Sequence, residues 1–412
     1  MPEAYVYITL PGATEAITAG RFEHSVAPSG VAVGRFVYGR RYRERDDAVE
    51  IDPVELRLGR ASFETVRLEG VFGALRDAGP DSWGRRVIEK HAGLGQIGEF
   101  DLLLNSPDDR AGALGFGLNV DPPAPSRAFN KTWDLEKLQG LADALLADDP
   151  PPDAAQVEAL LLLGTSMGGA RPKVVVESQS ALWLAKFNRP DDRWNMARVE
   201  LATLQLARRC GLQAAQSEIV TVGGRDVLLV KRFDREPVQG GYARARMVSA
   251  LTLLDTDDTN EGRTRWSYLL LAEILRRVSE RPAEDVRELF RRMVFNALVS
   301  NTDDHPRNHA AIAPGQGWRL SPAYDLTPSP MAAEERRDLA MACGAQGRFA
   351  NASNLVSECH RFLLTTSQAW TLVDEMERMV REGWYGVARE CGVTEADCRT
   401  ISRAYVYPGF RG

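Results

Sequence analysis

A dense polar cluster follows an apolar helical pattern at residues 301–308, which read NTDDHPRN. It places two carboxylates, one histidine and two asparagines within eight residues. The carboxylate of Asp303 could accept a proton from a hydroxyl nucleophile, and the amide oxygen of Asn308, five residues later, could bind Mg²⁺. A structural turn is the simpler interpretation, but a turn does not need so many polar groups.

The five-residue offset between Asp303 and Asn308 is that of the protein-kinase catalytic loop, HRDxxxxN. The neighbouring Asp304 lacks this offset. A metal-dependent hydrolase is the alternative, because His305, His309 and the two aspartates could together bind a metal ion. Tightly held zinc or iron would favour the hydrolase, and a metal-free preparation that binds ATP would exclude it.

A glycine-rich segment at residues 164–173, GTSMGGARPK, stands directly before a predicted strand. Its glycines would let backbone N–H groups approach a phosphate, and its lysine would add a positive charge. The segment matches neither the Walker A motif nor GxGxxG. By itself it could be a simple turn between a helix and a strand.

Three single residues complete the set of kinase motifs in the order in which they occur along a kinase sequence. Lys186 lies in an apolar strand, where burial is costly unless an anion is near, although a solvated edge strand would also accommodate it. Glu200, on the next predicted helix, could pair with it. Asp325 follows the polar loop by about 20 residues, as the second metal-binding aspartate of kinases does, although such an aspartate is often only a turn residue.

Hydrophobic periodicity predicts the elements that must position these residues. We expect strands at residues 5–10, 31–38, 173–177, 181–187, 217–222 and 226–233. We expect helices at residues 81–91, 135–163 with a break at prolines 150–152, 196–210, 266–278, 283–300, 366–391 and 394–405. A mixed β segment followed by a mainly helical half indicates an α+β protein with two lobes.

The composition excludes several classes of protein. The chain has 412 residues, 44% hydrophobic and 26% charged, as in ordinary soluble proteins. No apolar run approaches the roughly 20 residues of a membrane span, and the N-terminus shows no signal peptide. Five scattered cysteines without a CxxC pair argue against disulfides and zinc and suggest a cytoplasmic setting. A net charge of −6 indicates that any contact with DNA would be made through a partner.

The motifs in order resemble the HipA family of bacterial serine/threonine kinases, the toxins of type II toxin–antitoxin modules. The resemblance rests on DRAGALGF at 109–116, SMGGARPK at 166–173, LAKF, KRFDR at 231–235, NTDDHPRNHA and LSPAYDLTP. The early segment GALRDAGPDSWGRRVIEK is similar to the N-terminal domain of the family, so the resemblance covers nearly the whole chain.

The resemblance implies an α+β, two-lobed protein-kinase-like fold. Residues 1–120 would form an extra N-terminal HipA subdomain. Residues 121–240 would form the β-rich N-terminal lobe with the Gly-rich loop and the strand lysine, and residues 241–412 the mainly α-helical C-terminal lobe with the catalytic loop.

The resemblance also implies roles for individual residues. Asp303 would be the catalytic base, and Asn308 and Asp325 would bind Mg²⁺. Glu200 would form a structural ion pair with Lys186. The nucleotide would be contacted by Gly168, Gly169, Ala170, Arg171, Pro172 and Lys173 over its phosphates, Lys186 at the α/β phosphates, Lys231, Arg232 and Phe233 at adenine, and His305, Pro306, Arg307, Asn308, Tyr324 and Asp325 along the loop. Ser166 matches a regulatory autophosphorylation site, where a phosphate would eject the loop.

Two departures from the family pattern are visible. The loop reads GGARPK where the family often has AGAQEK, and Lys231 stands where the hinge often begins with glutamate. Neither change removes a catalytic group, and hinge contacts to adenine use the backbone.

The implied function is an ATP- and Mg²⁺-dependent serine/threonine kinase toxin. Its protein substrate would be a translation component such as an aminoacyl-tRNA synthetase. Its partner would be a HipB-like helix-turn-helix antitoxin, through which alone it would reach DNA, and no membrane would be involved. The alternative is a weakly active or inactive kinase-fold module that mainly binds a DNA-binding antitoxin.

Overall fold

The computed structural model describes residues 2–59, 61–92, 97–125, 129–147, 169, 171–331 and 333–412. The chain divides into two compact units. The first unit comprises Met1–Arg189, Lys231–Asp255 and Ile312–Trp318, and the second comprises Pro190–Val230, Thr256–Ala311 and Arg319–Gly412.

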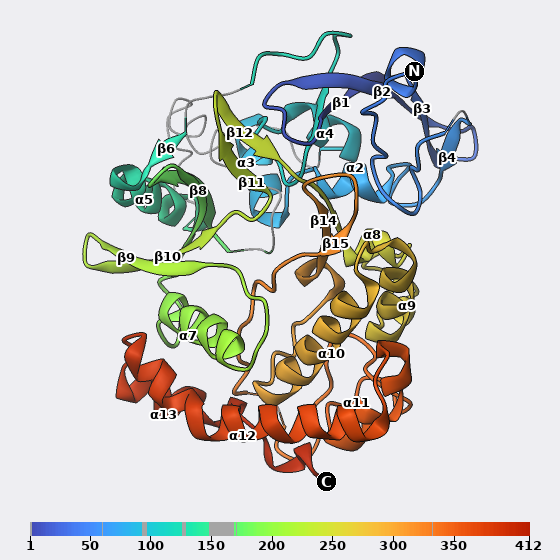
Figure 1. Ribbon diagram of the computed structural model, residues 1–412. Coiled ribbons are helices and arrows are strands. Elements are labelled where there is room, and N and C mark those ends of the chain that lie inside the picture. The colour runs from blue at the N-terminus through green and yellow to red at the C-terminus, as the bar shows by residue number, and fades with distance from the viewer. Residues whose placement is uncertain are drawn as a thin grey trace. The chain divides into compact units, whose positions relative to one another are not determined.

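An antiparallel sheet forms the N-terminal part of the first unit (Figure 1). Its order is β4(Phe63–Thr65)-β3(Ala32–Tyr38)-β2(Ala16–Val26)-β1(Glu3–Thr9)-β5(Leu114–Gly117). Phe22 and Phe36 lie opposite each other across β2 and β3, and both are fully buried. Gly20 in β2 is needed because a Cβ there would lie 2.4 Å from the carbonyl oxygen of Val37. The accompanying helices are α1(Arg40–Arg43), α2(Gly73–Asp77), α3(Ser82–Ala92) and α4(Glu99–Asn105).

A second group of strands in the first unit carries the predicted phosphate-binding lysines. β6(Asn130–Lys131) runs parallel to β7(Lys173–Ser178), which pairs antiparallel with β8(Ala181–Phe187). The turn between β7 and β8 has positive φ at both of its residues, Gln179 and Ser180, which matches the right-handed twist of a two-residue hairpin. The remaining elements are η1(Thr132–Asp134), α5(Leu135–Leu146), β11(Arg235–Val238), β12(Gly241–Arg244), β13(Arg246–Ser249) and α8(Ala250–Leu253).

The second unit is mainly helical. Its apolar centre is α10(Pro282–Leu298), and the long α12(Thr366–Glu390) contacts both α10 and α7(Met196–Arg209), as Figure 1 shows. A hairpin of β9(Ser217–Val222) and β10(Arg225–Lys231) turns at two glycines with positive φ. The other elements are η2(Gly262–Arg265), α9(Tyr268–Val278), η3(Pro306–Asn308), β14(Ala310–Ala313), whose last two residues are counted in the first unit, β15(Arg319–Leu320), α11(Ala352–Ser357), η4(Cys359–Phe362), α13(Glu395–Ile401), η5(Ser402–Ala404) and η6(Pro408–Phe410).

Most predicted elements are present, with shifted ends. The helix predicted at 283–300 ends at Leu298, because Ser300 takes a left-handed conformation with φ 53°. The helix predicted at 394–405 ends at Ile401 and continues only as a 3₁₀ turn. Of the helix predicted at 135–163, Leu135–Leu146 is observed, and residues 148–168 lie outside the described residues. Strand β2 is not predicted, because its interior glycine and charged residues weaken the alternating pattern.

Two further observations concern the cysteines and the described helices. All five cysteines are buried free thiols. Among the described helices, none is both long enough and apolar enough to cross a bilayer.

Candidate functional site

The polar loop at residues 301–308 directly follows the end of α10 in the second unit. After Leu298 the helix closes with a hydrogen bond from the backbone N–H of Asn301 to the carbonyl of Asn296, 2.8 Å long. Ser300 adopts φ 53°, and its hydroxyl donates to the carbonyl of Ala404 at 2.6 Å. A non-glycine residue in this conformation costs energy that the surrounding contacts must offset. The start of the loop is therefore held in one position.

Asp303 has a fixed backbone and an exposed carboxylate. Its carbonyl oxygen accepts from the backbone N–H of His305 at 2.9 Å and from the side-chain amide of Asn308 at 3.1 Å. The Asp303 side chain lies in an exposed position of the loop. The two residues with the kinase offset are therefore brought together, and the carboxylate is accessible to a substrate.

The amide oxygen of Asn308 is suited to a cation. Because the amide nitrogen of Asn308 donates to Asp303, its Oδ1 atom points elsewhere, is buried and has no hydrogen-bond partner among the described residues. Leaving such an acceptor unpaired costs about 1–3 kcal/mol. Mg²⁺ binds oxygen ligands of this kind, so the residue present fits the metal that the sequence predicts.

Asp304 differs sharply from its neighbour. Its side chain is 1% exposed, and its Oδ1 atom lies 2.9 Å from Nε2 of His309. The ring of His309 also packs edge-on against Tyr268. Asp304 and His309 thus face each other inside the unit, which supports Asp303 rather than Asp304 as the reactive carboxylate.

The hydrolase alternative requires a converging set of metal ligands. Within the described ranges, no group of three or more His, Cys, Asp or Glu side chains is arranged to bind a metal ion. The contact between Asp304 and His309 occupies two of the four residues that this alternative uses.

The segment that carries Asp325 is tied to the polar loop. The hydroxyl of Tyr324 donates to the carbonyl of Arg307 at 2.7 Å, and the N–H of Ser321 donates to the carbonyl of Ala310 at 2.8 Å. Asp325 is half-buried and has φ 57°, a conformation that aspartate and asparagine tolerate better than most residues. Both predicted metal ligands therefore belong to connected segments of one unit.

Lys186 and Lys173 lie directly opposite each other on β8 and β7 in the first unit. Opposed residues of an antiparallel pair project from the same face, so two positive charges stand side by side. Lys186 is half-buried. Glu200 is buried on α7 in the second unit, and its ion pair with Lys186 stays a prediction.

Lys173 is buried and has an acidic partner that the motifs do not indicate. Its Nζ atom donates to Oδ2 of Asp81 at 2.6 Å and to the carbonyl of Gly169 at 2.8 Å. Burial raises the pKa of Asp81, although Lys173 and the N–H groups of α3 act in the opposite direction. Asp81 precedes a predicted helix and lies in the early segment that is similar to the N-terminal domain of the family, but neither signal pairs it with Lys173. Gly168, Ala170 and Ser166 lie outside the described residues.

The predicted hinge is anchored by a buried ionic cluster. Arg232 is almost fully buried and donates to Asp109 at 2.5 Å and to both carboxylate oxygens of Asp234, at 3.0 and 2.8 Å. Its backbone N–H donates to the carbonyl of Leu182 on β8 at 2.9 Å. The side chain of Arg232 therefore holds the segment in place. Asp109 and Asp234 lie in the motifs DRAG and KRFDR, the one signal by which the sequence marks them.

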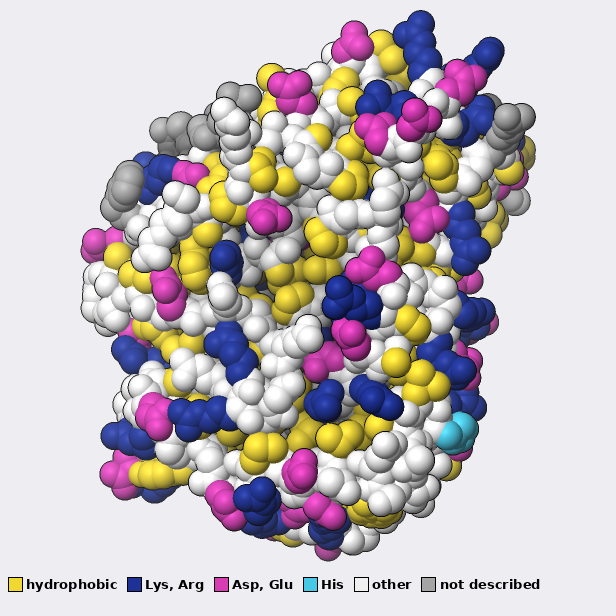
Figure 2. Space-filling model, viewed as in Figure 1, with side chains coloured by type: hydrophobic (Ala, Val, Ile, Leu, Met, Phe, Trp, Pro, Cys, Tyr) yellow, Lys and Arg dark blue, Asp and Glu magenta, His cyan; other side chains and the backbone are white. Residues whose placement is uncertain are grey.

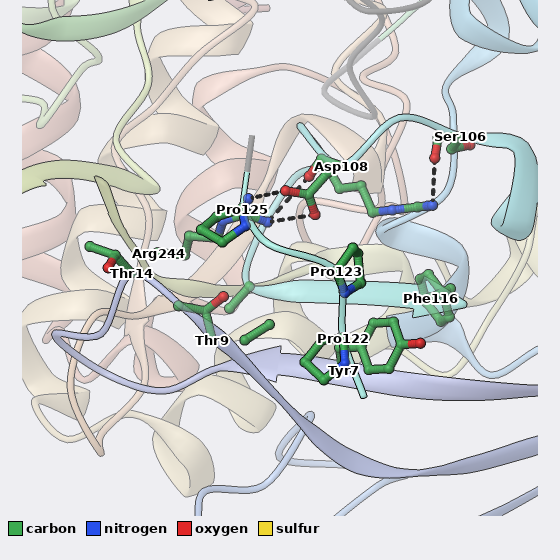
Figure 3. A pocket seen from close by; sticks show the side chains of 14 residues that line it. Tyr7, Thr9, Thr14, Ser106, Asp108, Phe116, Pro122, Pro123, Pro125 and Arg244 are labelled. Atoms are coloured by element: carbon green, nitrogen blue, oxygen red, sulfur yellow. Dashed lines mark hydrogen bonds and ion pairs between the residues drawn. The ribbon is translucent and has the colours of Figure 1, made fainter. Parts of the chain in front are cut away.

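A cavity of about 160 Å³ lies elsewhere in the first unit (Figure 3). Tyr7, Phe116 and three prolines contribute to its wall, and Asp108 faces Arg244 across 2.7 Å. Burial would raise the pKa of Asp108, but the charge of Arg244 outweighs it and holds the pKa below its usual value. Because these two charges satisfy each other, the cavity offers no obvious phosphate site.

Charged side chains of both signs are interspersed over the face shown in Figure 2. No single-signed basic surface is visible there. This distribution agrees with the net charge of −6.

Comparison with known proteins identifies relatives of the chain. The family model of the HipA-like C-terminal domain matches residues 165–384, more than half of the chain. A protein of Sinorhizobium fredii, "Putative kinase Y4mE", is 29% identical over 272 residues, which cover 62% of this chain and 63% of that protein. The serine/threonine-protein kinase toxin HipA of Shewanella oneidensis is 27% identical over 161 residues, 35% of this chain and 36% of the toxin. The matches thus span less than two thirds of these curated relatives.

A solved structure shows the fold. HipA of Shewanella oneidensis MR-1, determined with HipB and operator DNA, superposes with a TM-score of 0.66 over 97% of this chain and 94% of that one, at 16% identity. The predicted α+β, two-lobed kinase-like fold is therefore confirmed. The division at residues 120 and 240 stays a prediction.

Proposed function

The chain belongs to the HipA family, and from this premise we propose that it is an ATP- and Mg²⁺-dependent serine/threonine protein kinase. The observation that carries the proposal is the paired geometry of two residues. The carboxylate of Asp303 is exposed, while Asn308 supports its backbone and keeps a buried, unpartnered oxygen.

The proposed chemistry follows from these positions. Asp303 accepts the proton of a serine or threonine hydroxyl, whose oxygen forms a bond to the γ-phosphorus of ATP as the bond to the β–γ bridging oxygen breaks. Asn308 and Asp325 supply oxygen ligands for the metal. Mg²⁺, when bound, neutralises charge on the phosphates. Asp303 later releases its proton to solvent.

Residues of the first unit would hold the nucleotide. Lys186 would contact the α and β phosphates, and the segment from Gly168 to Lys173 would cover them. The backbone of Lys231, Arg232 and Phe233 would contact adenine. Arg232 supports this last role because its side chain, engaged with Asp109 and Asp234, fixes the path of the segment.

We also propose a toxin–antitoxin role in the cytoplasm. One relative is named as a kinase toxin, and the structurally similar HipA was determined with HipB and operator DNA. A HipB-like helix-turn-helix antitoxin would be the partner, and the acidic net charge supports DNA contact only through it. The substrate would be a translation component such as an aminoacyl-tRNA synthetase. Ser166 would be the site of autophosphorylation.

Phosphoryl transfer tests the kinase directly. The purified protein is incubated with γ-³²P-ATP and Mg²⁺, and we expect it to label itself or a serine/threonine acceptor. Chelation of Mg²⁺ should abolish the labelling. Equal labelling by wild type and Asp303→Ala would contradict the proposal. Phosphoproteomics after expression of the same two proteins would then identify the substrate.

The second candidate function is that of a binding module with little kinase activity. The resemblance to an antitoxin-bound HipA also fits a kinase-fold module that binds its partner but transfers phosphate weakly. Absence of any ATP-induced thermal shift, together with stable binding of a helix-turn-helix partner, would favour this module.

Asp325→Asn should lower Mg²⁺-dependent transfer at least about a hundredfold, because a metal ligand supports several kcal/mol of charge stabilisation. Asparagine tolerates the positive φ of Asp325, so the fold should persist. Titration of Mg²⁺ at fixed ATP should show a higher half-saturating concentration. If the half-saturating Mg²⁺ concentration were unchanged, Asp325 would not be a metal ligand.

A further inference from the structure

A buried ion pair connects the start of α3 to the end of the Gly-rich segment. Oδ2 of Asp81 accepts from Nζ of Lys173 at 2.6 Å, and both side chains are less than a tenth exposed. The other oxygen, Oδ1, accepts from the N–H of Gly84 at 2.8 Å and so caps α3. One carboxylate thus binds a helix end and a lysine 92 residues away.

The same lysine reaches back to the segment that precedes it. Nζ of Lys173 donates to the carbonyl of Gly169 at 2.8 Å. Gly169 has φ 69°, a conformation that favours glycine. The direction of this peptide group is therefore set by where Asp81 places the ammonium group.

The helix that carries Asp81 is itself anchored. Arg85 on α3 pairs with Glu99 on α4 at 2.7 Å, and Arg76 on α2 pairs with the same carboxylate at 2.9 Å. The first turn of α3 is thus connected to α2 and α4 through the carboxylate of Glu99. Lys173 also lies directly opposite Lys186, so its position affects the electrostatic environment of that second lysine.

We propose that Asp81 is a positioning residue for nucleotide phosphate. It holds Lys173 and, through Lys173, the backbone of Gly169, so that the N-terminal region of the chain sets the affinity for ATP. The inference rests on the proposed kinase function, and it adds a residue from outside the kinase motifs to the phosphate site. Asp81 would act through Lys173 and would not touch the nucleotide.

The test compares nucleotide binding with turnover. We expect Asp81→Asn to weaken ATP binding roughly 10- to 100-fold, because the charge-assisted contact that positions Lys173 is lost, while kcat at saturating ATP stays nearly unchanged. Binding is measured by calorimetry with Mg²⁺-ATP, and kcat by phosphoryl transfer. Tighter ATP binding by Asp81→Asn would overturn the proposal, because Asp81 would then compete with phosphate for Lys173.

Glu99→Gln is the matched control. It weakens the anchoring of α3 by Arg85 and Arg76 but leaves the pair of Asp81 and Lys173 intact. We expect unchanged ATP affinity for this variant, whereas an equal loss in both variants would show that only the docking of α3 matters. Asp81→Glu keeps the charge and should restore part of the affinity.

A double variant covers the case in which Asp81→Asn fails to fold because a buried lysine is left unpaired. Asp81→Asn with Lys173→Met removes both charges, which a folded interior tolerates better than one unpaired charge. We expect it to bind ATP as weakly as Lys173→Met alone. A further loss on adding Asp81→Asn would overturn the proposed route through Lys173.

The two proposals fail differently. If the wild-type protein binds no ATP, the kinase function and this inference are both wrong. If the wild type binds ATP and Asp81→Asn binds it equally well, the inference alone is wrong.

Discussion

Asp303→Asn will reduce kcat by about 10²- to 10⁴-fold, the usual contribution of a positioned general base, and will leave the affinity for ATP nearly unchanged. Asparagine has the size of aspartate but cannot accept the hydroxyl proton. The backbone contacts of residue 303 to His305 and Asn308 involve its carbonyl and should survive. Single-turnover transfer from γ-³²P-ATP measures the rate, and calorimetry measures binding.

Two control variants distinguish a loss of catalysis from a loss of folding. Glu280→Gln neutralises an exposed carboxylate of the same unit and should leave kcat unchanged. Asp304→Asn should act first on stability, because it removes the negative charge beside His309 in a buried position. If Asp304→Asn abolished transfer in a fully folded protein while Asp303→Asn did not, the assignment of the base would be wrong.

Arg232→Met will destabilise the first unit by about 3–5 kcal/mol, because the carboxylates of Asp109 and Asp234 would be left buried beside an apolar side chain. For a unit of this size the loss corresponds to a fall of roughly 10 °C in the midpoint of thermal unfolding. Differential scanning calorimetry measures it. Arg244→Met serves as the control, since its partner Asp108 is partly exposed and the loss should be about 1 kcal/mol or less.

Lowering the pH should reduce the difference in the free energy of unfolding between wild type and Arg232→Met. Burial alone would raise the pKa of Asp234, but Arg232 and Arg235 outweigh it and hold the pKa well below its usual value. A carboxylate of this kind stabilises the folded wild type above its unfolded-state pKa, about 3.9, and loses that contribution as the pH falls below it. Protonation also relieves the cost of the buried carboxylate that has lost Arg232 in the variant and keeps only Arg235 as its cationic partner. If the difference in unfolding free energy between the two proteins stayed constant down to pH 3, the buried ion pairs of Arg232 would not stabilise the fold as proposed.

The local sequence pattern was sufficient to predict the strands that carry the candidate site residues of the first unit. The continuous apolar runs at residues 173–177 and 181–187 predict the strands β7 and β8, and the paired glycines between β9 and β10 favour the observed hairpin, because strand formation and turn type depend on neighbouring residues. Helix ends were less predictable. The stop of α10 depends on the left-handed Ser300, whose hydroxyl is held by Ala404 from the far end of the chain.

The sequence by itself determined the identity and spacing of the catalytic candidates, since the offset from Asp303 to Asn308 lies within one short loop. Only the tertiary structure decided their surroundings. It buried Asp304 against His309, paired Lys173 with Asp81 across 92 residues, and placed Arg232 against Asp109 across 123 residues. The physical reason is that a buried charge must find an opposite charge, and packing rather than sequence distance determines which one is near.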